Sequence, residues 1–305
     1  MPAGVQTISD WFAAHEPVVY KHINLGKTQH KKVYDKIFKV GETKYQIEDQ
    51  AVWSGPNTFD RHLENQTIEP KKITVAWKSR KTAVFYTAML TASKESLIGE
   101  RTDGALRRKA ERMGLAGEVT PDWLTALFLD RGFTDVTIGD GKSLYATDHN
   151  LGQHGTFSNM SSDALSHAGI ESAMVALSQI KNYDGIPEAL DVGCIVVHPT
   201  KWPLLQTLMK TEKRTGGLFN DVSFVHDEGG GWDRVPNRFL QTTTYWHLIT
   251  EVTKRGDGLF LKWLEELNYV RDQVQAQRTA QFIGAMGLMY GCYDPHGAYG
   301  SNAVT

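Results

Sequence analysis

The chain has 305 residues, a formal net charge of −2, and the apolar (41%) and charged (22%) contents of an ordinary globular protein. This near-neutral charge argues against a dedicated nucleic-acid-binding module, which usually carries a strong basic excess. The two longest stretches free of Asp, Glu, Lys, Arg and His fall at residues 82–93 and 281–293, and both are too short to span a membrane. Residues 1–4 do not begin a secretory signal, and the two cysteines, Cys194 and Cys292, lie in apolar stretches. The composition therefore predicts a protein made in a reducing cytoplasm.

The first 72 residues lack the dense apolar pattern that a core requires. A short amphipathic piece, residues 8–14, is followed by Pro17 and a polar segment rich in Lys and His. Residues 1–30 are therefore predicted to form an arm laid over another surface. Two β-like runs, residues 33–40 and 44–47, lie on either side of a glycine and predict a long hairpin.

The next part of the chain predicts one strand followed by a helix. Ile73, Val75 and Trp77 recur at the period of two that is typical of a half-buried strand. From Phe85 onward the apolar residues fall at helical spacing, which predicts an amphipathic helix extending toward Ile98.

Two further helical patterns follow before residue 135. Leu106, Ala110 and Met113 recur at helical spacing among basic residues. Thr120 suits an N-cap and Pro121 the first position of a new helix, which Gly132 is expected to end.

The second half of the chain alternates helices with short strands, so the predicted class is mixed α+β. Helices are predicted at residues 164–181 and 200–210. Strands are predicted at residues 194–197, 224–226, 245–249 and 259–263, with a closing Gly-rich strand within residues 269–293.

Glycine-rich segments give no nucleotide-binding motif. Gly26-Lys27-Thr28 resembles the end of a phosphate-binding loop, but Lys21 stands where the first glycine is needed. The segments beginning at Gly139 and Gly229 lack the last glycine of a dinucleotide-binding pattern and are more typical of turns.

Asp148, His149 and His154 are residue types that bind zinc or iron, but no third and fourth ligand stands at a recognisable spacing. Solvated or turn-capping roles fit them better, and structural roles fit His198 and the pair His226-Asp227. No nucleophile elbow is present, and neither cysteine has a basic neighbour. We therefore predict no catalytic, cofactor-binding or metal-binding residue, no cofactor and no enzymatic activity. A hydrolase that uses the His149 region is the enzymatic alternative.

Basic residues are densest between residues 71 and 112, where acidic residues are interleaved with them. One interpretation is a solvated helix face with i,i+4 ion pairs, and the other is a subunit interface or a surface facing nucleic acid. The sequence leaves both open. The basic residues are Lys71, Lys72, Lys78, Arg80, Lys81, Arg101, Arg107, Arg108, Lys109 and Arg112.

Three blocks together resemble the major capsid proteins of tailed phages, whose fold is named after phage Hong Kong 97, and in particular their Mu-like major head subunit branch. The first block, residues 129–149, includes Asp140-Gly141-Lys142 and ends in Asp148-His149. The second is the helix and strand of residues 164–202, and the third is residues 269–295. The order of these blocks is more specific than any one of them.

This resemblance implies an α+β phage major capsid fold with an N-terminal arm, an extended hairpin loop, a peripheral domain with a long spine helix, and an axial domain. The implied boundaries are 1–30 for the arm, 31–72 for the hairpin loop, 73–155 for the peripheral domain, 156–265 for the axial domain and 266–305 for the closing strands. The helix predicted from Phe85 to Ile98 is the candidate start of the spine.

The resemblance also implies a structural protein that self-assembles into an icosahedral head enclosing double-stranded DNA. Its expected partners are its own copies, in hexamers and pentamers. Further partners are a scaffolding protein, a portal, decoration proteins, and packaged DNA through non-specific contacts, with no membrane. The implied location is the virion, assembled in the host cytoplasm. An encapsulin-like shell around a protein cargo is the alternative with the same fold, and a DNA-binding module is a third class.

Overall fold

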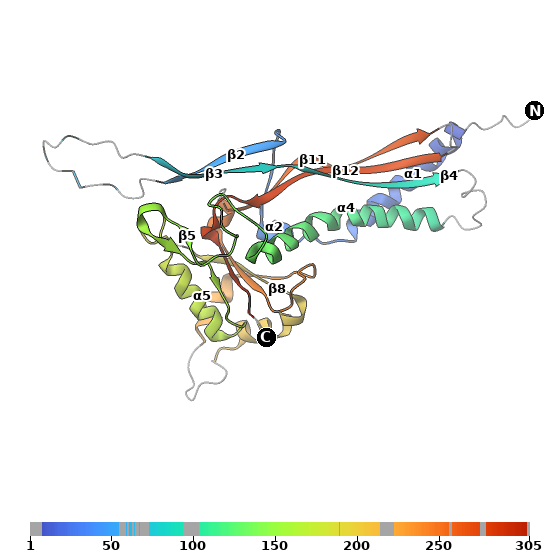
Figure 1. The fold of residues 1–305 in the computed structure, drawn as a ribbon. Helices are drawn as coiled ribbons and strands as arrows, with labels where there is room; N and C mark the ends of the chain where they lie inside the picture. The colour runs from blue at the N-terminus through green and yellow to red at the C-terminus, as the bar shows by residue number, and fades with distance from the viewer. Residues whose placement is uncertain are drawn as a thin grey trace, which may run out of the picture.

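The computed structural model describes residues 8–54, 59, 61, 62, 64, 67, 73–93, 104–188, 190–213, 223–255, 258–274 and 279–303. These residues form two lobes, each built around one β-sheet, and a two-stranded hairpin that projects from one end of the longer lobe (Figure 1). None of the helices described is long and apolar enough to cross a membrane.

A long four-stranded sheet forms the first lobe. Its order is β1-β11-β12-β4, with β1 parallel to β11 and the other neighbours antiparallel. The strands are β1 (Lys39–Glu42), β11 (Leu259–Val274), β12 (Thr279–Cys292) and β4 (Val84–Ser93). The helix α4 (Gly104–Asp130) runs along the sheet, and α1 (Ile8–Thr28) lies against α4 (Figure 1). Met286 and Leu288 of β12 are buried together with Leu124 and Phe128 of α4, so one face of the sheet is covered by this helix.

A five-stranded sheet of order β7-β13-β10-β8-β9 forms the second lobe. Its strands are β7 (Met160–Ser161), β13 (Ala298–Ser301), β10 (Trp246–Thr250), β8 (Val192–Val197) and β9 (Asp233–Pro236). The helices that pack on it are α5 (His167–Gln179), α6 (Trp202–Lys210) and α7 (Phe224–Glu228). Ser166 begins α5 as an N-cap, because its Oγ accepts a hydrogen bond from the Gly169 N–H at 3.1 Å.

The projecting hairpin consists of β2 (Ile47–Ser54) and β3 (Thr74–Thr82), which pair antiparallel. A second, very short pair is β5 (His149–Asn150) with β6 (Thr156–Phe157). Short 3-10 turns lie at Arg131–Phe133, Gly152–His154, Pro199–Lys201, Gly229–Gly231, Glu251–Arg255 and Pro295–Gly297.

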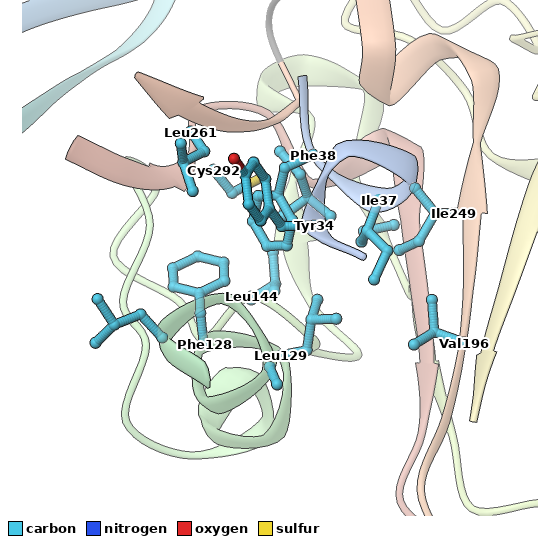
Figure 2. Close-up of a cluster of buried hydrophobic side chains, with 14 of the residues drawn as sticks. Tyr34, Ile37, Phe38, Phe128, Leu129, Leu144, Val196, Ile249, Leu261 and Cys292 are labelled. Atoms are coloured by element: carbon cyan, nitrogen blue, oxygen red, sulfur yellow. The ribbon is translucent and has the colours of Figure 1, made fainter. Parts of the chain in front are cut away.

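One core cluster joins the two lobes (Figure 2). The short helix α2 (Tyr34–Ile37) and the next residue, Phe38, are buried between Phe128 of α4 and Ile249 of β10. Tyr34, Ile37 and Phe38 expose 4%, 0% and 1% of their surface. Fully burying side chains of this size stabilises a fold by about 1.5–3 kcal/mol each. Residues 34–38 therefore belong to the core rather than to a projecting loop.

This placement corrects the predicted hairpin. Residues 33–40 do not form a β-run of the hairpin, because they contain α2 and the start of β1, which pairs with β11. The hairpin strands are instead β2 and β3, and the predicted strand around Val75 and Trp77 is confirmed as β3. A deletion that includes residues 34–38 would remove core side chains, so a deletion meant to test the hairpin must begin beyond β1.

The predicted helix from Phe85 to Ile98 is wrong over its described part, which is the strand β4. Both faces of β4 carry apolar residues, so its period of two is hidden and the remaining spacing imitates a helix. The neighbouring strand favours a strand over a helix here, because β12 supplies a complete antiparallel ladder from Leu288 to Thr279. The spine helix begins at Gly104 instead.

The predicted break at Thr120 and Pro121 is also wrong, because α4 is continuous from Gly104 to Asp130 with Pro121 inside it. The hydroxyl of Thr120 donates to the Ala116 carbonyl at 2.7 Å instead of capping a new helix. A proline within a helix removes one backbone hydrogen bond. The burial of the surrounding turn, including Asp122 and Leu124, offsets this cost.

In the second half most predicted elements are confirmed. The helices appear as α5 and α6, and the strands as β8, β10, the first residues of β11, and β12. The predicted strand at residues 224–226 is wrong. Those residues lie in α7, where Ser223 acts as N-cap by accepting from the His226 N–H at 3.3 Å.

His247 of β10 is a buried polar side chain without compensation. It is fully buried, it stacks on Tyr145 with ring centroids 5.3 Å apart, and neither ring nitrogen has a hydrogen-bond partner among the described residues. Burial lowers the pKa of His247 to about 3. The ordinary histidine pKa in the unfolded chain is about 6.5. Between about pH 3 and pH 6.5 the unfolded chain therefore binds a proton at His247 that the folded chain does not bind.

We expect His247→Leu to raise the free energy of unfolding at pH 7 by about 1–3 kcal/mol, the cost of an unsatisfied buried polar group. The wild type should also lose stability as the pH falls from about 6.5 toward 3, and the variant should lose less. Urea unfolding at pH 7 and pH 5 measures both effects. A less stable variant with an unchanged pH dependence would show that His247 has a partner.

Candidate assembly surfaces

The base of the hairpin is anchored on the chain's own body. Lys262 of β11 forms an ion pair with Glu48 of β2, and the Tyr293 hydroxyl donates to the Glu48 carboxylate at 3.3 Å. Burial alone would raise the pKa of Glu48, but hydrogen bonds from Lys262 and Thr43 outweigh it and hold this pKa below its usual value. Trp77 Nε1 donates to the Tyr293 carbonyl at 3.2 Å. The hairpin therefore leaves the body from a fixed position.

The far half of the hairpin carries exposed apolar side chains. We define the hairpin patch as Trp53, Ile73 and Val75, which expose 63%, 60% and 38% of their surface. Trp53 lies directly opposite Val75, after a register shift that follows the Val52–Trp77 pair. Val52 is buried on the chain's own body with Trp77 packed beside it, whereas Trp53, the next residue of β2, points to the opposite face and is exposed. The hairpin thus has apolar contacts with the body at its base and exposed apolar side chains beyond them.

The arm helix α1 is held against α4 by two close backbone contacts. A Cβ atom on Gly26 would lie 2.0 Å from the Glu111 carbonyl oxygen, and one on Gly114 would lie 2.0 Å from the Ile23 carbonyl oxygen. Any side chain larger than hydrogen would therefore push the helices apart. Around this crossing Ile23 is fully buried and His22 Nδ1 lies 2.7 Å from Glu111 Oε1.

The segment after the arm helix is fixed by Asp122 of α4, which is fully buried. Its carboxylate accepts from the Tyr34 N–H at 2.6 Å and the Val33 N–H at 3.1 Å, and it lies 2.5 Å from His30 Nε2. Burial raises the pKa of Asp122 despite these hydrogen bonds. This one side chain therefore joins the end of the arm and the start of α2 to the spine helix.

We expect Asp122→Ala to destabilise the subunit by about 3–5 kcal/mol, because it leaves the buried donors of Val33 and Tyr34 without an acceptor. Chemical denaturation of the purified subunit measures this loss. Asp49→Ala is the matched control, since Asp49 is an exposed carboxylate paired with Arg80 at 2.6 Å, and it should cost less than about 1 kcal/mol. Equal losses in the two variants would contradict the anchoring role.

The long sheet exposes apolar side chains on the face that α4 does not cover. We define the sheet patch as Phe85, Met89, Val270 and Ile283. Met89 of β4 and Val270 of β11 both lie opposite Ile283 of β12, so the three form one row across three strands. Phe85, Met89 and Val270 expose 51%, 59% and 56% of their surface. These side chains form one contiguous apolar row on the face that α4 leaves uncovered.

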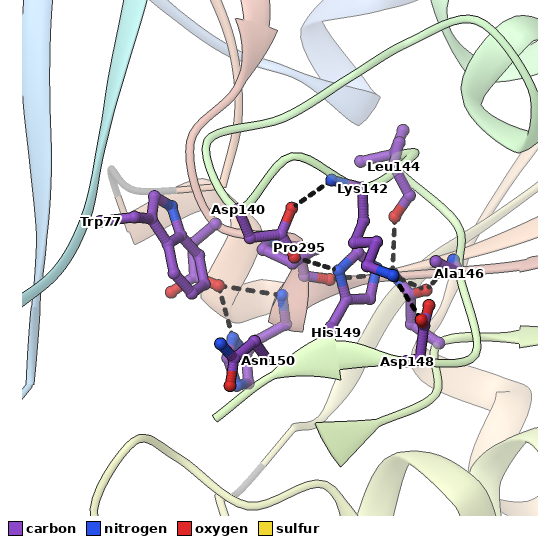
Figure 3. Close-up of polar contacts among 12 residues, drawn as sticks. Trp77, Asp140, Lys142, Leu144, Ala146, Asp148, His149, Asn150 and Pro295 are labelled. Atoms are coloured by element: carbon purple, nitrogen blue, oxygen red, sulfur yellow. Dashed lines mark hydrogen bonds and ion pairs between the residues drawn. The ribbon is translucent and has the colours of Figure 1, made fainter. Parts of the chain in front are cut away.

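His149 has a structural rather than a chemical role (Figure 3). It is fully buried, its Nδ1 lies 2.6 Å from Asp140 Oδ2, and its Nε2 lies 3.2 Å from Asn159 Oδ1. The Asn159 amide in turn donates to the carbonyls of Leu144 and Ala298 at 2.8 and 2.9 Å. Both ring nitrogens are thus engaged by other side chains of the chain. The loop of residues 140–149 is thereby linked through Asn159 to β13, one of the closing strands.

The other candidates from the sequence do not converge on His149. Asp148 is exposed and paired with Lys142, whereas the His154 ring packs against Gly185. His198 Nδ1 accepts a hydrogen bond from the Thr200 N–H at 3.2 Å, and His226 Nδ1 lies 3.2 Å from Asp227 Oδ1. Among the residues that the structure describes, no group of three or more His, Cys, Asp or Glu side chains could hold a metal ion.

The glycine-rich and basic segments also occupy structural positions. Gly26-Lys27-Thr28 closes α1, and Gly139 packs against Trp77. Gly141 has a φ of 81°, which suits a turn. Lys71, Lys72 and Arg101 lie outside the described residues.

Comparison with solved structures relates this geometry to known proteins. The capsid of cyanophage P-SCSP1u matches with a TM-score of 0.57 at 11% identity, over 90% of this chain and 89% of that chain. The procapsid of bacteriophage JBD30 matches with a TM-score of 0.53 at 13% identity, over 97% of this chain and 76% of that chain. In the JBD30 capsid the match covers 66% of the JBD30 chain. The chain has the Hong Kong 97-type capsid fold.

The predicted capsid fold is thereby confirmed. A virus-like particle from Pyrococcus furiosus shares this fold, with a TM-score of 0.52 at 8% identity over 92% of this chain and 96% of that chain. No protein-family model matches the chain, and no curated protein matches its sequence. The structures named here do not single out the Mu-like branch, which stays a prediction.

On this capsid fold, the features that sequence reasoning missed are contacts between distant segments. Gly26 and Gly114 were not distinguished from other glycines, because only the helix crossing shows why a side chain is excluded. The pairing of Trp53 with Val75 depends on a register shift in the hairpin. One signal was available for β4, since the longest uncharged stretches, 82–93 and 281–293, are typical of neighbouring strands in one sheet.

Proposed function

We propose that this chain is the major capsid protein of a tailed phage and that its copies assemble into an icosahedral shell around double-stranded DNA. The observation that carries this proposal is the hairpin, which has apolar side chains packed on the body at its base and exposed apolar side chains at its far end. In a lone subunit, the apolar side chains at that exposed end stay in contact with water and contribute no burial. Repeated copies can bury it on their neighbours, and a closed symmetric shell buries every copy in the same way. The capsid fold over nine-tenths of the chain supports this proposal.

The sheet patch is the surface we assign to the neighbour's hairpin patch. Both patches are apolar and lie on rigid strands, so they can meet without ordering a flexible segment first. Lys78 on the hairpin and Glu265 beside the sheet patch are exposed and of opposite charge, which favours one register of docking. Obligate interfaces of this kind bury about 2,000–5,000 Å².

For the domain organisation we propose five parts: an arm, a hairpin, a peripheral domain, an axial domain and closing strands. The sequence boundaries were 1–30, 31–72, 73–155, 156–265 and 266–305. The hairpin strands occupy residues 47–54 and 74–82, so we assign residues 47–82 to the hairpin and residues 31–46 to the connection through the core.

We also propose that the shell contacts DNA without sequence specificity and uses a scaffolding protein, a portal and decoration proteins. Exposed basic residues on α4, including Arg108 and Arg112, support a role in polyanion contact. The nearby Glu111 contacts His22 of the arm helix. The location that follows is the virion, after assembly in the host cytoplasm.

A protein shell around another cargo is the second candidate. The match to the Pyrococcus furiosus virus-like particle favours it, because that chain is covered almost completely. The contents of the particle separate the two candidates. Nuclease-resistant double-stranded DNA in particles from phage-producing cells supports a phage head, and a co-purifying protein without DNA supports the alternative.

Negative-stain electron microscopy of the purified full chain tests assembly itself. We expect closed shells, or tubes and sheets with one lattice spacing. A uniform monomer or dimer at all concentrations, also after co-expression with the genes beside it, would contradict a shell protein.

A further inference from the structure

The outermost strand of the long sheet, β4, is an open edge. Within the described parts of the chain, β4 pairs only with β12 and ends the strand order. Ala88 lies on the face that α4 covers and is nevertheless exposed, as is Val84 at 49%. The backbone groups of β4 that point away from β12 have no strand partner among the described residues.

This edge carries none of the features that normally prevent pairing with another chain. Natural edge strands are protected by charged side chains, proline, short length or bulges. The strand β4 has ten residues, VFYTAMLTAS, with no charge, no proline and no glycine. Its ladder with β12 runs from Ser93 to Val84 without a register shift. An edge of this length and character is suited to pair with a strand of another chain.

The surroundings of the edge are equally uncharged. The chain's two longest uncharged stretches, 82–93 and 281–293, lie side by side as β4 and β12. On the uncovered face, the row of Met89, Ile283 and Val270 reaches inward from this edge. A partner strand should therefore be neutral and should continue the apolar row.

We propose that β4 pairs antiparallel with β4 of a second copy across a two-fold axis, so that two four-stranded sheets become one sheet of eight strands. This proposal rests on the proposed function, in which copies of the chain form a shell. The same strand then supplies both sides of the contact, which makes the contact self-complementary. An axis perpendicular to the sheet keeps both copies of α4 on one face and places one residue of β4 opposite itself.

Ala88, near the middle of the exposed run, suits the central position because small side chains let the two strands approach. With Ala88 opposite itself, Phe85 faces Thr91 and Thr87 faces Met89 of the second copy. Each pair joins an apolar side chain to a β-branched one, which is favourable across strands.

The hairpin of a neighbour is a poorer partner for this edge. Its strands carry Asp49, Lys78 and Arg80 as exposed charges. The strand β4 offers no opposite charge to any of them. The self-pairing leaves no charge beside the new ladder, which is why we assign the edge to a second copy.

Single cysteines at positions 86 to 90 of the full chain test the pairing by oxidative cross-linking with copper phenanthroline. The native Cys194 and Cys292 are fully buried and do not interfere. Opposite residues have Cα atoms about 4.5–5.5 Å apart, within disulfide range. We expect a covalent dimer from Ala88→Cys, or from one other position in this range, and none from Val84→Cys. Absence of a dimer at all five positions would overturn the pairing, as would cross-linking only to a second cysteine placed in the hairpin.

A charge variant gives an independent measurement. We expect Ala88→Lys to lower the assembled fraction at least tenfold without changing the unfolding midpoint of the subunit. Val175→Lys is the matched control, because Val175 of α5 is exposed at 55% in the other lobe, and it should assemble like the wild type. Normal assembly of Ala88→Lys would overturn the inference while leaving the shell proposal intact. If the wild type forms no shell, the proposed function fails, and the cross-linking of the soluble chain still decides the pairing.

Discussion

Replacing Gly114 with valine is expected to release the arm helix from the spine helix and to abolish regular assembly. The Cβ atom would lie 2.0 Å from the Ile23 carbonyl oxygen, so the helices must separate. Forcing atoms into a close-packed contact costs about 1–3 kcal/mol. A cost at the upper end of that range shifts the docking equilibrium of α1 by about a hundredfold, since each 1.4 kcal/mol is a factor of ten. Limited proteolysis within residues 8–28 measures the release, and electron microscopy measures assembly.

Two further variants make the Gly114 result specific. Gly26→Ala should act in the same way, because its Cβ would lie 2.0 Å from the Glu111 carbonyl oxygen. Ala116→Val places a similar side chain on the exposed side of the same helix and should leave the arm docked. Protection of residues 8–28 in the Gly114 variant equal to that in Ala116→Val would show that the arm helix stays docked and that the crossing tolerates a side chain at position 114.

Replacing Trp53 and Val75 with serine is expected to prevent shell closure while the subunit stays folded. Both side chains are exposed in the subunit, and surface substitutions usually change the free energy of unfolding by less than about 0.5 kcal/mol. Buried tryptophans at interfaces typically contribute about 2 kcal/mol or more to binding. Because every subunit of a shell uses the same contact, this loss recurs at each interface. Sedimentation velocity measures shell assembly, and thermal unfolding of the same sample measures whether the subunit stays folded.

The matched control for the hairpin is Tyr45→Ser. Tyr45 exposes 70% of its surface, which is comparable to Trp53, and lies outside the hairpin patch. We expect this variant to assemble like the wild type. Normal particles from the Trp53 and Val75 double variant would exclude the hairpin patch as an intersubunit contact. A lowered unfolding midpoint would show that the patch packs within its own subunit.

The elements that the sequence predicted correctly have a single dominant local signal. Val75 and Trp77 alternate in β3, and α5 presents one apolar stripe. In β8 the short apolar run predicted at residues 194–197 is fully buried. Each of these signals is contained within one element, so contacts with distant segments do not change the predicted secondary structure.

The wrong predictions arose where distant segments decide the structure. Phe85 and Met89 face away from α4 while Tyr86 and Leu90 face toward it, and apolar residues on both faces hide a strand's period. Pro121 is tolerated inside α4 because tertiary burial compensates for one lost hydrogen bond. The assembly surfaces were hidden for the same reason. The sequence predicted an arm and a hairpin without a core of their own, but the patch residues follow from strand register and from a helix crossing.

An electron cryomicroscopy reconstruction of the assembled protein would show where each hairpin lies. We expect a closed shell in which Trp53 of each hairpin lies on the sheet patch of an adjacent copy, against Met89 and Val270. A particle without such contacts, or a chain that stays monomeric with its hairpin exposed to solvent, would contradict this expectation.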